Sequence, residues 1–419
     1  MTIADLLHTV TDGEIPMRVE AFDGSVAGSS DRGLTLKLHN ERGLRYLITA
    51  PGDLGLARAY VSGDLELVGA PPGDPYLALQ ALTQWRFQRP RVAQLPGFLQ
   101  EIGFRRLVPP EPPAQEALPR VRRAFEGMRH SRKRDGEAIS KHYDVSNEFY
   151  GYVLGRSMAY TCAVFAKPDV SLEEAQEEKF DLVARKLALE PGMRLLDVGC
   201  GWGGMALHAA RHYRVNVVAI TLSKAQADWA AAAVERERLS GQVRVLHGDY
   251  RDSPGSAYDA VSSIGLLEHV GVGNYGSYFR FLRGKLRDGG RLLNHCITRP
   301  DNNSPALTGP FIDRYVFPDG ELAGSGRIIS EAQDAGFEVR HAENLREHYA
   351  LTLQAWCANL AANWDACVRE VGVETARVWG LYMAGSRVGF EINKVQLHQV
   401  LAVNTSKDGD ASYPLRPSW

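Results

Sequence analysis

Short apolar runs alternate with helix-like stretches between Arg194 and Thr298. Mainly apolar runs that end in Gly, Asp or Thr are typical of buried strands, whereas apolar residues three or four positions apart are typical of helices. Strands that alternate with helices form a parallel sheet, and ligands bind at the carboxyl ends of its strands. We expect strands at 194–200, 215–221, 243–249, 258–267 and 291–298, and helices at 205–213, 225–239 and 275–286.

The flanking patterns divide the chain. Residues 1–80 are expected to form a small mixed α/β domain, with a short helix followed by strand-like runs at 17–25, 34–39 and 45–51. Residues 81–140 are interpreted as a proline-containing basic linker and residues 141–419 as the main domain. Residues 299–327 are expected to form an insertion before a helix at 328–335.

Composition bounds the class of protein. The chain has 419 residues, of which 44% are hydrophobic and 23% charged, with 41 Gly and 21 Pro. These values are ordinary for a globular protein and exclude a collagen, a coiled coil or wholesale disorder. A net charge of −2 argues against a dedicated nucleic-acid-binding protein, which usually has a basic domain.

Positive charge is nevertheless concentrated in one segment. Between Arg86 and Lys141, 13 Lys and Arg stand against 6 Asp and Glu. One interpretation is a solvated linker with scattered surface charge. The alternative is attraction to an anionic membrane surface, where each basic side chain contributes about 1 kcal/mol.

The cysteines and the N-terminus bear on the compartment. An odd number of cysteines without CxxC spacing predicts neither a disulfide framework nor a zinc site, and no other metal site is expected. The first residues show no basic segment followed by an apolar one, and no later stretch approaches about 20 apolar residues. We therefore expect a cytoplasmic protein. The five cysteines are Cys162, Cys200, Cys296, Cys357 and Cys367.

A glycine-rich turn follows the first strand of the alternating region. The sequence from Leu196 to Gly204 reads LDVGCGWGG, and glycine allows the backbone to approach a ligand closely. Dinucleotide-binding enzymes use a similar turn. Here Asp197 lies inside the turn and suits a cationic aminoacyl group, while residues 219–223 end the second strand without an acid. Both details favour S-adenosylmethionine over NAD.

Separated motifs in one order strengthen this interpretation, and from Lys141 to about Val403 the chain resembles the cyclopropane fatty acyl phospholipid synthases and the related mycolic-acid and fatty-acid methyltransferases. The resemblance implies a Rossmann-like class I methyltransferase fold with a mostly parallel seven-stranded sheet. It also implies that residues 1–80 form a lipid- or membrane-associated domain. The motifs are HYDVSN from His142, YTC from Tyr160, the glycine turn, TLSKAQ from Thr221, GDYRD from Gly248, IGLLEHVG from Ile264, HCIT from His295, FIDRYVFP from Phe311 and HY from His348.

The resemblance also implies the site residues. The implied cofactor contacts, taken together with Asp197 from the turn, are Tyr160, Thr161, Asp197, Gly199, Gly201, Thr221, Gln226, Asp249, Tyr250 and Ile264. A bound bicarbonate ion is the implied base, held by Cys162 and Ile297 through backbone groups and by Glu268, His295 and Tyr349 through side chains. Aromatic faces within about 6 Å attract a cation, and the candidates are Tyr143, Tyr278, Phe311 and Tyr315.

The expected reaction is methylation of an acyl double bond. An alkene has no proton to lose first, so its π electrons take the methyl group and a carbocation forms before a proton leaves. Exclusion of water then prevents formation of an alcohol. A thiolate nucleophile at Cys162 is not expected, because no step requires one.

Several outcomes stay open at this stage. The favoured product is a cyclopropane in the acyl chain of a membrane phospholipid, and the alternative is a methylene branch that a separate reductase converts to a methyl branch. Remoter alternatives are O- or N-methylation of a small molecule and a retired lipid-binding module. The expected partners are the lipid, a peripheral membrane surface and a possible second copy of the chain, with no nucleic acid.

Overall fold

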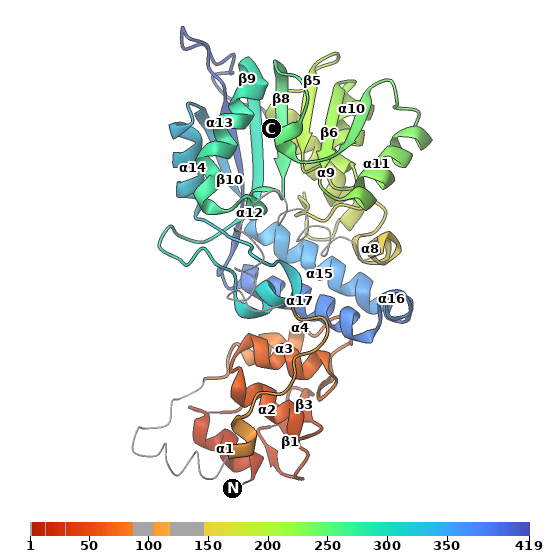
Figure 1. Cartoon of the computed structure of the whole chain (residues 1–419), viewed down its shortest axis with the longest axis vertical. Helices are drawn as coiled ribbons and strands as arrows, with labels where there is room; N and C mark the ends of the chain where they lie inside the picture. Colours follow the sequence, from red (N-terminus) through yellow and green to blue (C-terminus); the bar gives the residue numbers. More distant parts are fainter. Residues whose placement is uncertain (1, 13, 30, 87–103, 118–145) are drawn as a thin grey trace. The chain divides into compact units, whose positions relative to one another are not determined.

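The computed structural model describes residues 2–12, 14–29, 31–86, 104–117 and 146–419. The chain divides into two compact units (Figure 1). The first contains residues 1–118, 309–316 and 356–388, and the second contains residues 119–308, 317–355 and 389–419. The first unit therefore includes two segments that are far from residues 1–80 in sequence, one of them within the insertion expected at 299–327.

The first unit contains a four-stranded sheet in the order β2-β1-β3-β4, with β1 parallel to β3 and the other pairs antiparallel. The strands expected at 17–25 and 34–39 are confirmed as β1 and β3. Its elements are α1 (Ile3–Val10), β1 (Arg18–Ala21), β2 (Val26–Ala27), β3 (Thr35–Leu38), α2 (Glu41–Thr49), α3 (Asp53–Val61), β4 (Leu65–Val68), α4 (Tyr76–Leu82), the 3₁₀ turn η2 (Phe104–Leu107), the π-helical turn η6 (Ile312–Val316) and α16 (Trp364–Val371).

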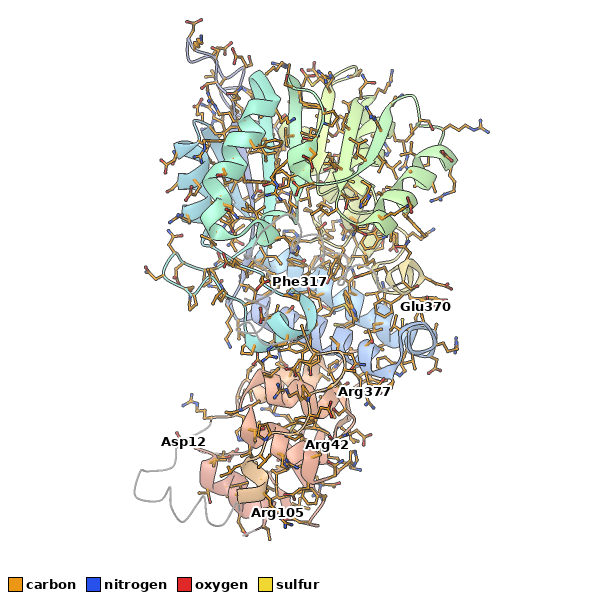
Figure 2. All side chains as sticks on the ribbon, in the orientation of Figure 1. Asp12, Arg42, Arg105, Phe317, Glu370 and Arg377 are labelled. Carbon is orange, nitrogen blue, oxygen red and sulfur yellow. The ribbon has the colours of Figure 1, made fainter. Side chains whose placement is uncertain are left out.

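The prediction of a strand at 45–51 is wrong, because residues 45–49 belong to α2. The Asn40 side chain caps this helix by accepting from the Gly43 N–H at 3.0 Å. Arg42, labelled in Figure 2, adds a bidentate contact to buried Asp64, with 2.6 and 2.9 Å bonds. The β-branched residues Ile48 and Thr49 favoured a strand, but the cap and the packing of Leu44 and Tyr46 outweigh that preference.

A buried ionic cluster holds the first unit together. The Glu116 side chain is completely buried and accepts two 2.7 Å bonds from Arg58. Arg314 donates to the same carboxylate at 2.9 Å, and the Tyr315 hydroxyl donates to it at 3.1 Å. Residues 309–316 are thereby tied to α3 through one carboxylate.

The second unit contains the seven-stranded sheet, in the order β10-β11-β9-β8-β5-β6-β7. Only β11 runs opposite to its neighbours, so the sheet is mostly parallel and the expected class I methyltransferase fold is confirmed. The strands are β5 (Arg194–Val198), β6 (Asn216–Thr221), β7 (Val243–His247), β8 (Tyr258–Ile264), β9 (Leu286–Thr298), β10 (Glu338–Asn344) and β11 (Gln396–Val403).

Helices cover both faces of this sheet. Successive residues of a strand point to opposite faces, and Leu195 and Leu196 accordingly lie in different hydrophobic clusters. One cluster packs against α12 (Leu267–Val270), α13 (Tyr275–Lys285) and α14 (Ser325–Asp334); in Figure 1, α13 and α14 lie beside β9 and β10. The other cluster packs against α9 (Leu172–Leu187), α10 (Gly204–Tyr213) and α11 (Lys224–Arg236).

Polar residues and a few further helices and turns complete the described structure. Polar caps fix two helix starts: Ser171 and Glu174 form a reciprocal capping box at α9, and Ser223 caps α11 through the Gln226 N–H. In the described parts of the chain, no helix is both long and apolar enough to span a bilayer. The remaining elements are α8 (Asn147–Leu154), η4 (Tyr250–Asp252), η5 (Val272–Asn274), α15 (Arg346–Ala362) and α17 (Val373–Glu391).

Glu116→Ala should destabilise the first unit by up to about 3–5 kcal/mol, because it leaves Arg58 and Arg314, whose side chains are only 12% and 18% exposed, without their carboxylate. Differential scanning calorimetry of the full chain measures this as a lower transition temperature. Glu66→Ala is the matched control, since Glu66 pairs with His39 at 3.1 Å but its side chain is 57% exposed. Equal effects of the two substitutions would contradict a stabilising role for the cluster.

Candidate active site

A cavity of about 880 Å³, including the part open to solvent, lies at the carboxyl ends of β5, β6 and β8. Ligands of open α/β sheets bind at this edge, outside the carboxyl ends of the strands. Nine of the ten residues expected to bind the cofactor line it: Tyr160, Thr161, Asp197, Gly199, Gly201, Thr221, Gln226, Tyr250 and Ile264.

The glycine turn forms one wall of the cavity. Gly199, Gly201 and Gly203 have φ values of 73°, 54° and 86°, in the left-handed region that favours glycine. The Gly199 and Cys200 N–H groups both donate to the Ile220 carbonyl, at 2.9 and 3.0 Å. A Cβ atom at Gly201 would meet no atom within 4 Å, so the backbone here borders open space.

Asp197 supplies a buried carboxylate beside the turn. Its Oδ1 accepts from the Ser262 hydroxyl at 2.6 Å, while its buried Oδ2 has no hydrogen-bond partner among the described residues. Burial raises the pKa of Asp197 to about 6, and the Ser262 bond and Lys179 oppose the shift. An oxygen of this kind beside a cavity can accept from a cationic ligand group.

Thr221 and Gln226 are hydrogen-bonded to each other. The Thr221 hydroxyl donates to Gln226 Oε1 at 2.8 Å, and both side chains are buried. The end of β6 and the first turn of α11 therefore present one preorganised polar surface to the cavity.

Two side chains of α9 that the sequence did not single out hold the segment carrying Tyr160 and Thr161. Gln176 donates to the Thr161 carbonyl at 2.9 Å, and Lys179 donates to the Thr161 hydroxyl at 2.9 Å. Both side chains are fully buried. Burial lowers the pKa of Lys179 to about 7, while Cys162 and Asp197 oppose that shift.

Asp249 and Tyr250 differ in position. Asp249 does not line the cavity, and its carboxylate accepts from the Arg251 backbone at 2.9 Å and from the Arg251 side chain. Tyr250 does line the cavity. A cofactor contact by Asp249 stays a prediction. His269, which was also not singled out, lines the cavity and packs edge-on against Phe317, labelled in Figure 2, with ring centroids 5.5 Å apart.

The residues expected to hold the base lie outside the lining of this cavity. Glu268 comes from α12, and its Oε1 accepts from the Ile297 N–H on β9 at 2.7 Å. Its buried Oε2 has no hydrogen-bond partner in the described ranges. Burial raises the pKa of Glu268 to about 7, against the lowering effect of the Ile297 bond.

His295 lies two residues before Ile297 on β9 and is 1% exposed. Its Nδ1 lies 3.2 Å from the amide nitrogen of Gln399 on β11. Its Nε2 is buried without a hydrogen-bond partner among the residues that the structure describes. Burial holds the pKa of His295 well below its ordinary value, so the neutral imidazole is favoured. The cavity lies close by, since Gly265, which lines it, donates to the His295 carbonyl at 2.8 Å.

Cys162 and Tyr349 meet at Leu345. The Cys162 thiol lies 3.8 Å from the Leu345 carbonyl, which also accepts from the Tyr349 N–H at 3.2 Å. The Tyr349 ring packs on Phe390 with centroids 4.5 Å apart. Complete burial raises the pKa of Cys162, which agrees with its not being expected as a thiolate nucleophile.

The described aromatic candidates belong to two different units of the chain. Tyr278 is a core residue whose hydroxyl lies 2.5 Å from Ser263 Oγ, and its ring lies edge-on to Tyr250 at 5.6 Å. Phe311 and Tyr315 belong to the first unit, where their ring centroids are 5.5 Å apart. Tyr143 lies outside the described residues. A cation-stabilising role for any of them stays a prediction.

Comparison with known proteins gives a consistent family. The sequence pattern of the mycolic acid cyclopropane synthetase family matches residues 130–400. A probable fatty acid methyltransferase of Mycobacterium tuberculosis is 57% identical, covering 100% of this chain and 98% of that protein. A cyclopropane-fatty-acyl-phospholipid synthase of Escherichia coli strain K12 is 35% identical over 65% of this chain and 69% of its own length.

Two solved structures of cyclopropane synthases are similar to this chain and agree with the family found from sequence. A mycolic acid cyclopropane synthase complexed with SAH and CTAB is 33% identical, with a TM-score of 0.60, and covers 64% of this chain and 97% of that one. A cyclopropane synthase from Mycobacterium tuberculosis gives the same TM-score at 32% identity, with the same coverage.

Glu268 should make stability depend on pH. Its carboxyl ionises near 4.5 when exposed and near 7 when buried, so the folded state binds more protons between these values and stability falls as pH rises through this window. Relative to Glu268→Gln, the free energy of unfolding should therefore fall by up to about 3 kcal/mol from pH 4.5 to 7, at 1.36 kcal/mol per pKa unit. Urea denaturation of both proteins across this range measures the difference. A difference that does not change with pH would refute the raised pKa.

Proposed function

The chain belongs to the mycolic acid cyclopropane synthetase family of S-adenosylmethionine-dependent methyltransferases, and on that premise we propose that it methylates the double bond of unsaturated phospholipid acyl chains. The observation that carries the proposal is the buried polar group of Glu268, Ile297 and His295 beside the cavity that the expected cofactor-binding residues line. Methylation of an exposed oxygen or nitrogen has no use for such a water-poor polar group.

The cavity fits the cofactor by its chemistry. S-adenosylmethionine supplies an electrophilic methyl group when bound. Asp197 Oδ2, buried and without a hydrogen-bond partner among the described side chains and backbone, would accept from its ammonium group. The linked pair Thr221 and Gln226 would hold the ribose, and the turn at Gly199 and Gly201 would allow close approach of the backbone.

The protein's own groups then have to align the alkene, exclude water and remove one proton. Alignment supplies several kcal/mol of the barrier. In this proposal a bound bicarbonate ion is the base that removes the proton. The site can bind such an ion, because Glu268 and His295 offer hydrogen-bonding groups to an anion that carries an OH. The Glu268 carboxylate would accept from that OH, while His295 and the Tyr349 hydroxyl would donate to the oxygens. The Ile297 N–H already donates to Glu268, so its expected contact with the ion would require sharing.

Two products remain compatible with this site. Loss of a proton from the new methyl group with ring closure gives a cyclopropane. The similarity to the cyclopropane-fatty-acyl-phospholipid synthase of Escherichia coli supports this product. The second candidate is a methylene branch: a 1,2-hydride shift moves the cation onto the methylated carbon, and loss of a methyl proton then forms the double bond; the 57% identity to a probable fatty acid methyltransferase supports it. A separate reductase would convert that branch to a methyl group.

Product analysis tests the proposal. The purified enzyme is incubated with S-adenosylmethionine and vesicles of a phospholipid with monounsaturated chains, and the lipids are fragmented in a mass spectrometer. We expect a mass gain of one CH₂ confined to the acyl chain, with fragments that distinguish a ring from a methylene branch. A gain in the headgroup, or none, would overturn the assignment.

Bicarbonate should limit the rate. In degassed, carbonate-free buffer after prolonged dialysis, turnover should fall, and added bicarbonate should restore it.

Glu268→Gln should keep nearly normal affinity for S-adenosylmethionine in calorimetric titration but lose at least about 10²-fold in turnover, as expected for lost acid–base function. Its residual rate should not respond to bicarbonate.

The controls separate the ion from the protein. Formate at equal ionic strength should not restore the rate. Unchanged turnover after proven removal of the ion would favour a protein base, with Glu268 and Tyr349 the first residues to replace. A near-normal rate of Glu268→Gln would remove that carboxylate from the mechanism.

An enzyme that acts on phospholipid must dock on a membrane. The positive charge of the basic segment, residues 86–141, favours such docking. Its cluster Arg129, Arg132, Lys133 and Arg134 lies outside the described residues. Replacing all four by Gln should reduce binding to anionic vesicles, and wild-type binding should weaken as salt rises, since screening acts over about 8 Å at physiological ionic strength. Vesicle sedimentation measures both.

Turnover on detergent-dispersed lipid is the control for this variant. It should fall less than turnover on vesicles. An equal loss on both substrates would assign the cluster to folding of its own domain, and unchanged vesicle binding would remove it from membrane recognition.

A further inference from the structure

A buried relay of polar side chains ends at His295. Gln399 on β11 is 0% exposed and lies opposite His295 in the register of β11 and β9. Lys186 near the end of α9, also 0% exposed, donates to Gln399 Oε1 at 2.7 Å. Gln399 Nε2 lies 3.2 Å from His295 Nδ1. Lys186 also contacts the Glu343 carboxylate on β10.

The chemistry of these groups fixes the direction of each hydrogen bond. An ammonium group only donates, so the Gln399 atom that faces Lys186 must be the oxygen. The NH₂ group of Gln399 then faces His295 and only donates, so His295 Nδ1 must accept. A neutral imidazole that accepts at Nδ1 carries its proton at Nε2.

The surrounding charges are consistent with this direction. Burial lowers the pKa of Lys186, but its bond to the Glu343 carboxylate opposes that shift and favours the ammonium form. Burial lowers the pKa of His295, and the two positive groups Lys179 and Lys186 lower it further, which disfavours an imidazolium.

We propose that Lys186 and Gln399 are positioning residues that hold His295 as its Nε2–H tautomer, so that the ring offers a hydrogen-bond donor and not a lone pair at Nε2. The Nε2 atom of His295 is buried and has no hydrogen-bond partner among the described residues, whereas Nδ1 faces Gln399. The consequence for catalysis rests on the proposed function: His295 binds an anion and cannot itself take the proton through Nε2.

Nuclear magnetic resonance of the full chain tests the tautomer directly. The protein is labelled with ¹³C,¹⁵N-histidine in a deuterated background, and the His295 signals are assigned by their loss in His295→Gln. The ring nitrogen shifts distinguish Nε2–H, Nδ1–H and imidazolium. We expect Nε2–H in the wild type; an Nδ1–H ring would overturn the proposal without any variant of the relay being needed.

Gln399→Glu reverses the relay with almost no change in shape. A carboxylate accepts from both Lys186 and His295, so Nδ1 should become protonated and turnover should fall about 10²-fold, as for other lost preorganised donors. His398 is the internal control, because its ring bonds Thr298 Oγ1 at 2.8 Å and its side chain points to the opposite face of β11. Its signals should not change.

The outcomes separate this proposal from the proposed function. If Gln399→Glu folds with normal thermal stability and His295 Nδ1 stays unprotonated, the positioning role is overturned. If the tautomer switches as expected but turnover never depends on bicarbonate, the relay stands and the proposed ion fails. Lys186→Met is the second variant: it frees the Gln399 amide to rotate, so a mixture of the two neutral tautomers is expected, and an unchanged pure Nε2–H ring would overturn the role of Lys186.

Discussion

Burial of ionisable groups at the carboxyl edge of one sheet is the constraint on which the site depends. Asp197, Lys179, Glu268 and His295 are each held where their charged forms are disfavoured, and burial is the largest cause of every one of these pKa shifts. Such groups cost folding free energy unless they are paired. At Asp197 Oδ2, Glu268 Oε2 and His295 Nε2 the described protein atoms do not complete the pairing, and a ligand or an ordered water with complementary hydrogen-bonding groups would complete it.

The helix α9 supports both halves of this site. Its Gln176 and Lys179 fix the segment that carries Tyr160 and Thr161, and its Lys186 reaches Gln399 behind His295. One rigid helix thus sets a wall of the cofactor cavity and the orientation of a ring in the neighbouring polar group. Polar side chains on the buried face of a helix are expensive, and here each is used to orient a group at the site.

Much of the sheet and the cofactor wall could be predicted from the sequence, because strand periodicity and a glycine turn are local signals. The run from Arg194 to Val198, the turn after it and the position of Thr221 follow from residues close together in the chain. Residues 45–51 are expected as a strand from their local sequence, whereas residues 45–49 lie in a helix that begins at a cap formed by Asn40. Residues 309–316 belong to the first unit, where Arg314 pairs with the carboxylate of Glu116, almost 200 residues away, and no local pattern carries that information. The sequence does contain a signal for the polar residues of α9, because Gln176, Lys179 and Lys186 occupy buried positions of an amphipathic helix. Their partners are known only from the fold.

The fate of the transferred methyl group tests most directly whether this buried site methylates carbon and then removes a proton. The enzyme is given S-adenosylmethionine that carries a trideuterated methyl group together with unsaturated phospholipid, and the product is analysed by mass spectrometry. Carbon methylation followed by loss of a deuteron from the new methyl group predicts a lipid that retains two of the three deuterium atoms in its acyl chain. A product that retains all three, on a headgroup or on a small molecule, would show that no proton is removed from the methyl carbon and would contradict the role proposed for Glu268 and His295.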